Sequence, residues 1–366
     1  MQSTESSWLH AASAMNNFAK RLLAWSDEHG RKDLPWQQDA TLYRVWVSEV
    51  MLQQTQVQTV IPFFNRFMKR FPDIETLAAA RQDDVLSHWS GLGYYARARN
   101  LHKAARTIRD AYSGQFPESI DDVLTLPGIG PSTAGAILSL SKGQRHAILD
   151  GNVKRVLARH DAIAGWPGKS DVANVLWKVA ERYTPTPRVS DYTQAIMDLG
   201  AILCTRSKPG CGKCPVSESC AALQHNSVGD YPGRKPKVSK PLRSTTMILA
   251  NANGQVYLER RPEAGIWGSL WSLPELGEQS ISDWCNEVLG SSATQTSSWS
   301  VLRHSFSHYD LDIQPIVVRV ESDGGKVADA DATIWYKLDD APPGGMAAPV
   351  KKLIDQLKKR EDVAHS

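Results

Sequence analysis

The sequence predicts a two-domain protein, with an all-α domain in residues 1–228 followed by an α+β domain in residues 244–366. With 366 residues, the chain is long enough to build two hydrophobic cores. Apolar residues recur with helical spacing up to about residue 230, and short β-type runs begin at Ser244. Between these regions, residues 229–243 contain three prolines and five basic residues, which is typical of a linker.

The composition is that of a globular protein, because 42% of the residues are hydrophobic and 22% are charged. A net charge of +3 permits a nucleic-acid partner without demonstrating one. No apolar run approaches membrane-spanning length and the first residues lack a secretory pattern, so we expect a cytoplasmic protein with no membrane partner. Four of the five cysteines lie within Cys204–Cys220, which favours a metal or cluster site over a disulfide framework.

A glutamate stands on the apolar face of the second expected helix, which begins near Thr41 after an amphipathic helix at Leu9–Glu28. The inward stripe consists of Leu42, Val45, Trp46, Val57 and Val60. Glu49 occupies the same face, where a core residue belongs. Two interpretations stay open: a structural carboxylate satisfied by buried partners, or a general acid whose pKa is raised by desolvation. Further helices are expected at Phe63–Phe71, Ile74–Trp89, Asp171–Tyr183 and Thr193–Ala201.

The segment Gly91–Asn100, GLGYYARARN, combines glycines, paired tyrosines and two arginines. Such a loop suits insertion of an aromatic ring into a base stack while Arg97 and Arg99 hold phosphates. The alternative is a tyrosine that anchors the core beside two ordinary surface arginines.

A glycine-containing hairpin is expected within residues 121–141, between a helix that ends near Thr125 and one that begins at Pro131. Asp121 or Asp122 is expected to cap the first helix. Gly128 and Gly130 free the backbone to approach a ligand, and the unpaired amides at the start of the second helix suit a phosphate. The alternative is a helix–turn–helix corner in an ordinary helical core. The sequence LDGNV, which contains Asp150, follows shortly afterwards.

The spacing of Cys204, Cys211, Cys214 and Cys220 provides four thiolates in a compact loop without histidine. Sites with four thiolates hold tetrahedral zinc or an iron–sulfur cluster. Only Cys211 and Cys214 form the short pair that zinc sites usually repeat, so the pattern is unusual for zinc, and free structural cysteines are a third interpretation.

The second region is expected to be α+β. Its strands are predicted at Thr245–Ala250, Gln255–Glu259, Leu311–Val320 and Thr333–Lys337, with a hairpin turn at Asn253–Gly254 and helices near Ile281–Leu289 and Val350–Lys359. With Glu259-Arg260-Arg261 and the stretch Gly265–Trp271, the start of this region resembles the Nudix hydrolase fold. Glu275, Glu278 and Glu287 do not form the glutamate-rich run that would hold magnesium, so we expect a binding module. His308, in Phe306-Ser307-His308, suits either a binding or a structural role.

The motifs SEVMLQQTQV, GLGYYARARN, LPGIGPSTAGAI, LDGNV, the four cysteines and the FSH stretch together resemble the adenine DNA glycosylases of the MutY type, from about Phe18 to Ile354. The resemblance implies a helix–hairpin–helix glycosylase core with a 4Fe-4S cluster loop at residues 204–220 and a Nudix-like domain that recognises 8-oxoguanine. It also implies a monomer that removes adenine opposite 8-oxoguanine or guanine from double-stranded DNA in base excision repair, associated with the bacterial nucleoid.

The resemblance also assigns residue roles. Glu49 and Asp150 are the catalytic carboxyl groups, assisted by Asn152 and Ser132. The expected DNA contacts are Gln54, Tyr94, Gly128, Gly130, Gln194 and Trp36. The residues expected to recognise 8-oxoguanine are Phe306, Ser307 and His308, and the cluster ligands are Cys204, Cys211, Cys214 and Cys220. Bifunctional relatives carry a lysine at the Ser132 position and form a Schiff base through it, so this chain is expected to leave an abasic site.

Two other classes of protein remain as alternatives. A pyrimidine-lesion glycosylase/lyase of the endonuclease III type would need the hairpin lysine and would not need the second domain. A non-catalytic iron–sulfur DNA-binding protein would explain the hairpin and the cysteines but gives no reason for carboxyl groups at both Glu49 and Asp150.

Overall fold

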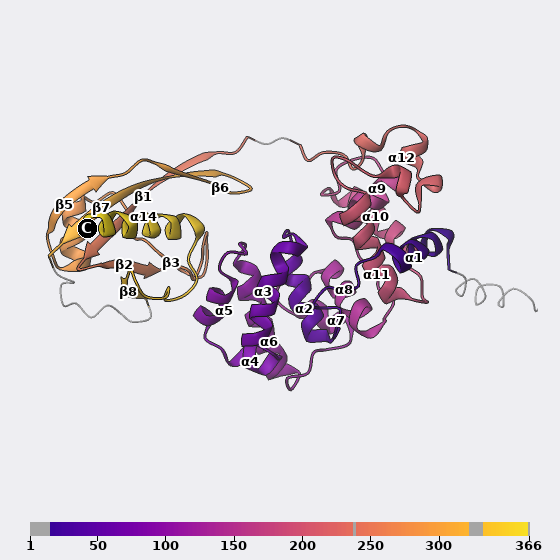
Figure 1. Ribbon diagram of the computed structural model, residues 1–366, viewed down its shortest axis with the longest axis horizontal. Helices are drawn as coiled ribbons and strands as arrows, with labels where there is room; N and C mark the ends of the chain where they lie inside the picture. Colours follow the sequence, from indigo (N-terminus) through magenta and orange to yellow (C-terminus); the bar gives the residue numbers. More distant parts are fainter. Residues whose placement is uncertain (1–14, 237–238, 322–331, 365–366) are drawn as a thin grey trace, which may run out of the picture. The chain divides into compact units, whose positions relative to one another are not determined.

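The computed structural model describes residues 15–236, 239–321 and 332–364. The chain forms two compact units. The larger unit comprises Met1–Ala78 and Lys103–Lys237, and the smaller unit comprises Ala79–His102 and Val238–Ser366. Figure 1 shows the two groups of elements, helical and sheet-containing, in the colours of the sequence.

In its described part, the larger unit is built from helices and contains no strand. The α-helices that lie wholly or partly in it are α1 (Asn17–His29), α2 (Leu42–Leu52), α3 (Val57–Arg70), α4 (Ile74–Ala79), α6 (Ala96–Ala111), α7 (Ile120–Thr125), α8 (Pro131–Lys142), α9 (Gly151–His160), α10 (Ser170–Tyr183), α11 (Val189–Asp198) and α12 (Ala221–Gln224). A π-helical turn, η1 (Leu199–Leu203), continues α11, and the short turns η2 (Cys211–Lys213), η3 (Ser217–Ser219) and η4 (Val228–Asp230) follow.

Most helix boundaries follow local signals. The side chain of Asn16 caps α1 by accepting a hydrogen bond from Ala19 N, and α8 begins with Pro131 at a position that needs no N–H donor. The hairpin is confirmed, since α7 ends at Thr125 and Gly128 adopts a φ of 80°. The part of the first expected helix that precedes residue 15 lies outside the described residues.

Three details of the expected helices are wrong. The stretch Ile74–Trp89 forms two helices, of which the first ends at Ala79 and the second begins at Gln82. The cap of α7 is Ser119, while Asp121 and Asp122 lie in its first turn, where their charges favour the helix dipole. The third correction concerns the inward stripe of α2. This helix ends at Leu52 and a turn precedes α3, so Val57 and Val60 belong to the next helix. The spacing of apolar residues was continuous across a turn that contains polar glutamines.

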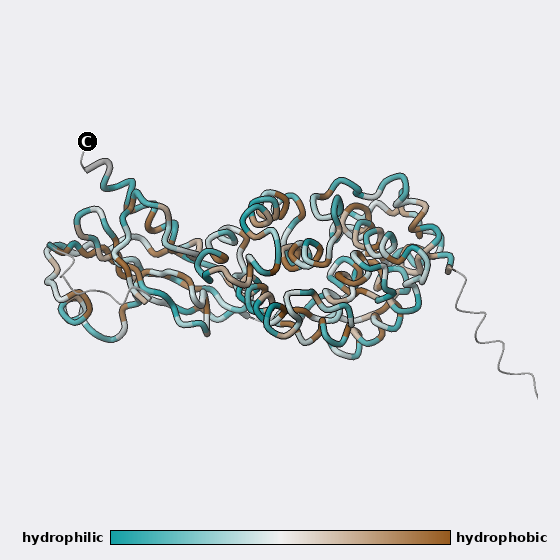
Figure 2. Tube along the Cα trace, turned by 90° about the horizontal axis from the view of Figure 1, so that it is seen from below, coloured by the Kyte–Doolittle hydropathy of each residue, from teal (hydrophilic) through white to brown (hydrophobic). Residues whose placement is uncertain are grey.

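The larger unit has a hydrophobic core between α1, α9, α10 and α11, with Phe18, Leu22, Leu157, Leu176 and Ile196 among its buried members. Trp46 on α2 and Phe64 and Phe67 on α3 are fully buried, and α2 packs against α8. Figure 2 shows hydrophobic residues alternating with hydrophilic ones along the chain, as expected for amphipathic elements that bury one face. This packing brings α2 next to the helix that follows the hairpin.

The smaller unit contains a mixed sheet, which confirms the expected α+β class. Its strands are β1 (Leu242–Ala252), β2 (Gln255–Arg260), β3 (Trp271–Ser272), β4 (Glu275–Leu276), β5 (Ala293–Ser298), β6 (Leu302–Ser305), β7 (Asp310–Val320) and β8 (Thr333–Lys337). The main path of the sheet runs β3-β2-β1-β7-β5, while β4, β6 and β8 pair with β1, β7 and β2. Strands β1 and β7 are parallel, and the other pairs are antiparallel.

The smaller unit also contains α5 (Gln82–Trp89), which precedes the strands in the chain. The helix α13 (Ile281–Trp284), with the π-helical turn η5 (Cys285–Leu289), lies between β4 and β5, and α14 (Ala348–Ala364) follows β8. The hairpin turn between β1 and β2 is confirmed, with positive φ at both Asn253 and Gly254. Cys285 is fully buried in the core beside Trp284 and Leu289. The described part of the chain contains no helix long and apolar enough to cross a membrane.

Candidate active site

A cavity of about 410 Å³ in the larger unit gathers most of the residues predicted to act on DNA. The predicted residues that line it are Trp36, Glu49, Gln54, Ser132, Asp150, Asn152 and Gln194. They come from the loop before α2, from α2 and its end, from the start of α8, from the start of α9, and from α11. The cavity therefore lies where the amino-terminal ends of α8 and α9 meet the end of α2.

Glu49 is the acid on the buried face of α2. Its helix neighbours Ser48 and Val50 are buried, and Ser48 turns its hydroxyl inward to donate to Val45 O at 2.8 Å. Burial raises the pKa of Glu49 to about 8, and the nearby Asp150 carboxylate adds a smaller effect in the same direction. Glu49 therefore keeps its proton at neutral pH.

Asp150 caps α9, and its Oδ1 accepts a hydrogen bond from Val153 N at 2.7 Å. Burial raises the pKa of Asp150, while backbone hydrogen bonds from Val153 and Asn152 and the charges of Arg155 and Lys154 act against that rise. The amino-terminal end of a helix favours a negative charge. When Glu49 and Asp150 share one proton, these contacts place the charge on Asp150 and leave the proton on Glu49.

Ser132 and Asn152 make hydrogen bonds on either side of Asp150 in the sequence. Ser132 Oγ accepts a hydrogen bond from Leu149 N at 2.9 Å, which ties α8 to the residue before Asp150. Asn152 Oδ1 accepts from Arg155 Nη2 at 2.9 Å. Gly200 must remain small, because a Cβ there would lie 2.6 Å from Asn152 Cβ.

Arg155 is a structural residue that the sequence did not single out. Its guanidinium donates to Cys204 O and to Gly200 O, both at 2.7 Å, so α9 is tied to the segment that leads into the cysteine loop. Nothing in the local pattern distinguishes this arginine from a surface residue, because the two carbonyl groups that it binds lie more than forty residues away in the sequence.

Gln194 and Trp36 form part of the cavity wall. Trp36 is 4% exposed and its ring meets that of Phe64 edge-on, with centroids 5.4 Å apart. Gln194 Nε2 donates to Asp198 Oδ1 at 2.8 Å. Gln54, which also lines the cavity, is exposed and has a φ of 57°. This positive φ marks a sharp turn of the backbone after α2.

The glycines of the hairpin are not among the residues that line this cavity. Gly130 is the cap residue of α8, and a Cβ added there would meet no atom within 4 Å. The backbone at this point therefore faces open space, with the first amides of α8 beside it. Ser132 and Thr133, which follow shortly after Gly130, line the cavity. The start of α8 therefore contributes both to the exposed hairpin and to the cavity wall.

Tyr94, which belongs to the smaller unit, is 56% exposed and adopts a φ of 51°. Arg97 does not lie on the surface as expected, since it is only 9% exposed. It donates to Leu92 O at 3.3 Å and to Gly93 O at 3.1 Å, and its guanidinium lies 5.4 Å from the centre of the Tyr94 ring. Arg97 therefore shapes the loop that exposes Tyr94.

Phe306, Ser307 and His308 form the turn between β6 and β7, where Phe306 N donates to Tyr309 O at 2.9 Å. Ser307 and His308 are exposed. Phe306 packs in an aromatic cluster with Trp267, His304 and Tyr309, with centroids 4.6 to 5.5 Å away. Aromatic packing thus supports a turn whose two polar side chains face solvent.

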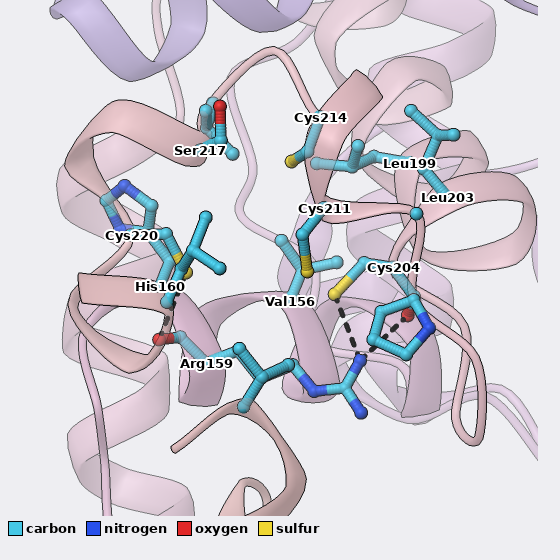
Figure 3. A pocket seen from close by; sticks show the side chains of 15 residues that line it. Val156, Arg159, His160, Leu199, Leu203, Cys204, Cys211, Cys214, Ser217 and Cys220 are labelled. Atoms are coloured by element: carbon cyan, nitrogen blue, oxygen red, sulfur yellow. Dashed lines mark hydrogen bonds between the residues drawn. The ribbon is translucent and has the colours of Figure 1, made fainter. Parts of the chain in front are cut away.

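The four clustered cysteines line a second cavity in the larger unit, and Figure 3 shows their sulfur atoms facing a common space. Val156, Leu199, Leu203 and Val216 provide apolar walls. Arg159 Nη1 lies 3.4 Å from Cys204 Sγ and also donates to Thr205 O at 2.8 Å. In the described residues, no group of three or more His, Cys, Asp or Glu side chains converges on a position for a single metal ion.

The chemistry of this cysteine cage suits a metal cluster. Burial, with a smaller effect from the other thiols, raises the pKa of Cys214 to about 11, and burial also raises the pKa of Cys220. Thiols in such surroundings stay protonated unless a positively charged metal group stabilises the thiolates. Four sulfurs spread around one apolar space fit a multi-iron group better than one ion at a tetrahedral centre.

Comparison with known proteins identifies the family. Residues 47–182 match the HhH-GPD superfamily of base excision DNA repair proteins, and residues 245–356 match the NUDIX domain. An adenine DNA glycosylase from Buchnera aphidicola is 38% identical over 93% of this chain and 98% of its own length. This chain belongs to the adenine DNA glycosylase family. The human adenine DNA glycosylase is 30% identical over 92% of this chain and 73% of its own length.

This adenine DNA glycosylase is therefore a hydrolase of N-glycosyl bonds that binds DNA in base excision repair. The solved structure of a thermostable thymine-DNA glycosylase is 26% identical and aligns with a TM-score of 0.50, covering 57% of this chain and 95% of that one. That match reflects the shared fold of the helical region.

In the NUDIX domain of the glycosylase, three glutamates lie apart along the chain. Glu275 is on β4 and pairs with Arg261 at 2.5 Å, Glu278 follows β4, and Glu287 is on η5. They come from three successive stretches of the chain and do not share one helix, so they lack the arrangement in which a single helix presents carboxylates to magnesium.

Proposed function

We propose that this glycosylase removes adenine mispaired with 8-oxoguanine or guanine in duplex DNA and leaves an abasic site. The observation that carries the proposal is the pair of carboxyl groups in one cavity, where burial keeps Glu49 protonated and the start of α9 favours charge on Asp150. Because one chain supplies both groups, we propose that it acts as a monomer. We assign catalysis to residues 1–228 and lesion recognition to residues 244–366, with 229–243 as linker.

The proposed mechanism uses the two carboxyl groups in sequence. Glu49 donates its proton to N7 of a flipped adenine, which makes the base a better leaving group. The glycosidic electron pair leaves with the base, and the negative charge of Asp150 stabilises the cationic sugar. Water then adds to the anomeric carbon and loses a proton to a carboxylate, which gives the abasic site and free adenine. Ser132 holds the backbone before Asp150, and Asn152 binds the side chain of Arg155 one turn along α9.

The absence of an amine at position 132 supports a hydrolytic outcome. A hydroxyl cannot form a Schiff base, and Ser132 Oγ is already engaged by Leu149 N. We assign Gln54 and Tyr94 as residues that enter the base stack, because each is exposed on a backbone of positive φ. Gly128 and Gly130, with the free amides of α8, are assigned to a DNA phosphate.

Recognition of 8-oxoguanine is assigned to the turn between β6 and β7. The lesion differs from guanine by a hydrogen on N7 and an oxygen on C8, and Ser307 and His308 offer an exposed hydroxyl and an imidazole. Phe306 and its aromatic neighbours hold the turn in place.

Replacing both Ser307 and His308 by alanine should weaken lesion selection by roughly 10-fold or more, since two polar contacts are lost. The rate of adenine excision at saturating enzyme should change much less, because the catalytic cavity is untouched. The measurement is affinity and single-turnover rate on duplexes with adenine opposite 8-oxoguanine and opposite guanine. Exposed Ser297→Ala on β5 is the control. Unchanged discrimination between the two duplexes would contradict this assignment.

We propose that Cys204, Cys211, Cys214 and Cys220 hold a 4Fe-4S cluster. Replacing Cys211 by serine should lower the iron content and the broad visible absorption of the purified protein and reduce its melting temperature by several degrees. Cys285→Ser, a fifth cysteine buried in the smaller unit, is the matched control and should keep full iron content. Equal iron content in both variants would count against a four-cysteine site.

The test of the proposed function is single-turnover cleavage of duplexes with adenine opposite 8-oxoguanine, guanine or thymine. Alkaline workup reveals abasic sites, and omission of alkali reveals strand cleavage by the enzyme itself. We expect rapid adenine release opposite 8-oxoguanine, slower release opposite guanine, little opposite thymine, and strand breaks only after alkali. Equal release in all three duplexes would refute the proposed mispair preference, and strong cleavage without alkali would refute the hydrolytic outcome.

A further inference from the structure

A buried carboxylate lies behind the wall of the catalytic cavity and has no part in the mechanism above. Asp198 is fully buried at the end of α11. Its Oδ2 accepts from Arg31 N at 2.9 Å, and its Oδ1 accepts from Arg31 Nε at 2.9 Å and also from Arg31 Nη2. A buried acid with this many donors is held in one position by its partners.

The same carboxylate holds Gln194, one helical turn earlier. Gln194 Nε2 donates to Asp198 Oδ1 at 2.8 Å, and Gln194 also lines the catalytic cavity together with Trp36 and Arg31. A carboxylate accepts hydrogen bonds and cannot donate them. The amide of Gln194 must therefore turn its NH₂ group towards Asp198, which leaves its carbonyl oxygen as the group it can offer to the cavity.

Reversal of this amide is costly. It would place the carbonyl oxygen of Gln194 against a carboxylate oxygen and leave a buried acceptor with one donor fewer. Arg31 adds to this restraint because its backbone N–H donates to Asp198 Oδ2 and its guanidinium donates to Oδ1, the oxygen that also accepts from Gln194. Asp198, which does not line the cavity, thus determines that Gln194 presents a hydrogen-bond acceptor to it.

We propose that Asp198, held by Arg31, is a positioning residue that makes the base pocket accept a purine with a 6-amino group and reject one with a 6-oxo group. An amide carbonyl accepts a hydrogen bond from the amino group of adenine, whereas it repels the oxygen at the same position of guanine or hypoxanthine. This inference rests on the proposed function, since it takes the cavity to be the adenine pocket. It concerns selection of the excised base and is separate from recognition of the opposite base.

The test compares three bases at the excision position: adenine, purine without a 6-substituent, and hypoxanthine. Single-turnover release is measured for the native chain and for Asp198→Asn. Asparagine can donate as well as accept, so it permits either orientation of Gln194. We expect the adenine-to-purine rate ratio to fall by roughly 10-fold, the effect of one hydrogen bond to a buried group, and the hypoxanthine-to-purine ratio to rise.

A purely structural role for Asp198 gives a different result, because general loss of order slows release of all three bases by the same factor. Gln194→Leu keeps the buried pair and removes the amide, so it should lower the adenine-to-purine ratio by itself. Adding Asp198→Asn to Gln194→Leu should then leave that ratio unchanged. If Asp198→Asn fails to fold, Arg31→Lys, which keeps the charge but loses the fork, should shift the ratios in the same direction by a smaller factor.

The outcomes separate this proposal from the function on which it rests. If the native chain releases adenine and the substitutions slow all three bases equally, the orienting role of Asp198 is wrong and the proposed function stands. If the native chain releases none of the three bases from any duplex, the proposed function and this inference both fail.

Discussion

Replacing Asp150 by asparagine should slow single-turnover adenine release by roughly 1,000-fold or more, which is the scale of losing a main electrostatic contact to the transition state. The sugar becomes cationic as the base leaves, and the neutral amide offers no charge to stabilise it. Asparagine is as good a helix cap as aspartate, so the hydrogen bond to Val153 N and the start of α9 should be preserved. The variant should therefore bind the mispaired duplex and melt near the native temperature.

The measurement is release of adenine under excess enzyme, with DNA affinity determined in parallel. Asp171→Asn makes the same chemical change in the first turn of α10, at an exposed position, and serves as the matched control. Activity of Asp150→Asn within 10-fold of the native rate would remove Asp150 from the mechanism. Loss of both binding and folding would instead show that the carboxylate is needed for the structure around α9, because asparagine preserves the cap itself.

Replacing Glu49 by glutamine should slow adenine release by roughly 100- to 10,000-fold, the range for loss of a general acid. In the native enzyme, release should also decline as the pH rises through about 8, where Glu49 loses its proton. The variant should lose this dependence. Single-turnover rates from pH 5 to pH 9 provide the test, and a flat native profile across pH 8 would contradict the assignment.

The same substitution has a stability consequence of known sign. The pKa of Glu49 rises from an ordinary 4.5 to about 8 on folding, so the folded state favours the protonated form. Below pH 4.5 both states are protonated and ionisation carries no penalty. Between these values the penalty grows by about 1.4 kcal/mol per pH unit, and above pH 8 it is constant. Glu49→Gln should therefore melt higher than the native chain at pH 8 and close to it at pH 4.5, whereas exposed Glu28→Gln should show no such trend.

Local signals explain which parts of the fold could be predicted. The boundary of α8 follows from Pro131, the hairpin turn from Asn253 and Gly254, and strand β8 from its β-branched and aromatic residues. The candidate acid Glu49 stood out because a charge interrupts an apolar stripe. These features depend on residues within one or two helical turns, so the nearby sequence is enough to predict them.

Long-range pairings explain what could not be predicted. Asp198 is joined to Arg31 across 167 positions, and Arg155 to Cys204 across 49. The sequence around each of these residues gives no sign of its distant partner. The grouping of Ala79–His102 with the carboxy-terminal segment has the same origin. Strands such as β3 and β4 are two residues long and are defined by their partners in the sheet.

Ser132 also bears on how this enzyme can evolve. A lysine at this position would supply an amine, the group through which a Schiff base forms. Lysine has no acceptor, however, so it would leave the buried Leu149 amide without its partner next to Asp150. The first step from hydrolysis towards strand cleavage therefore begins with a less ordered catalytic turn.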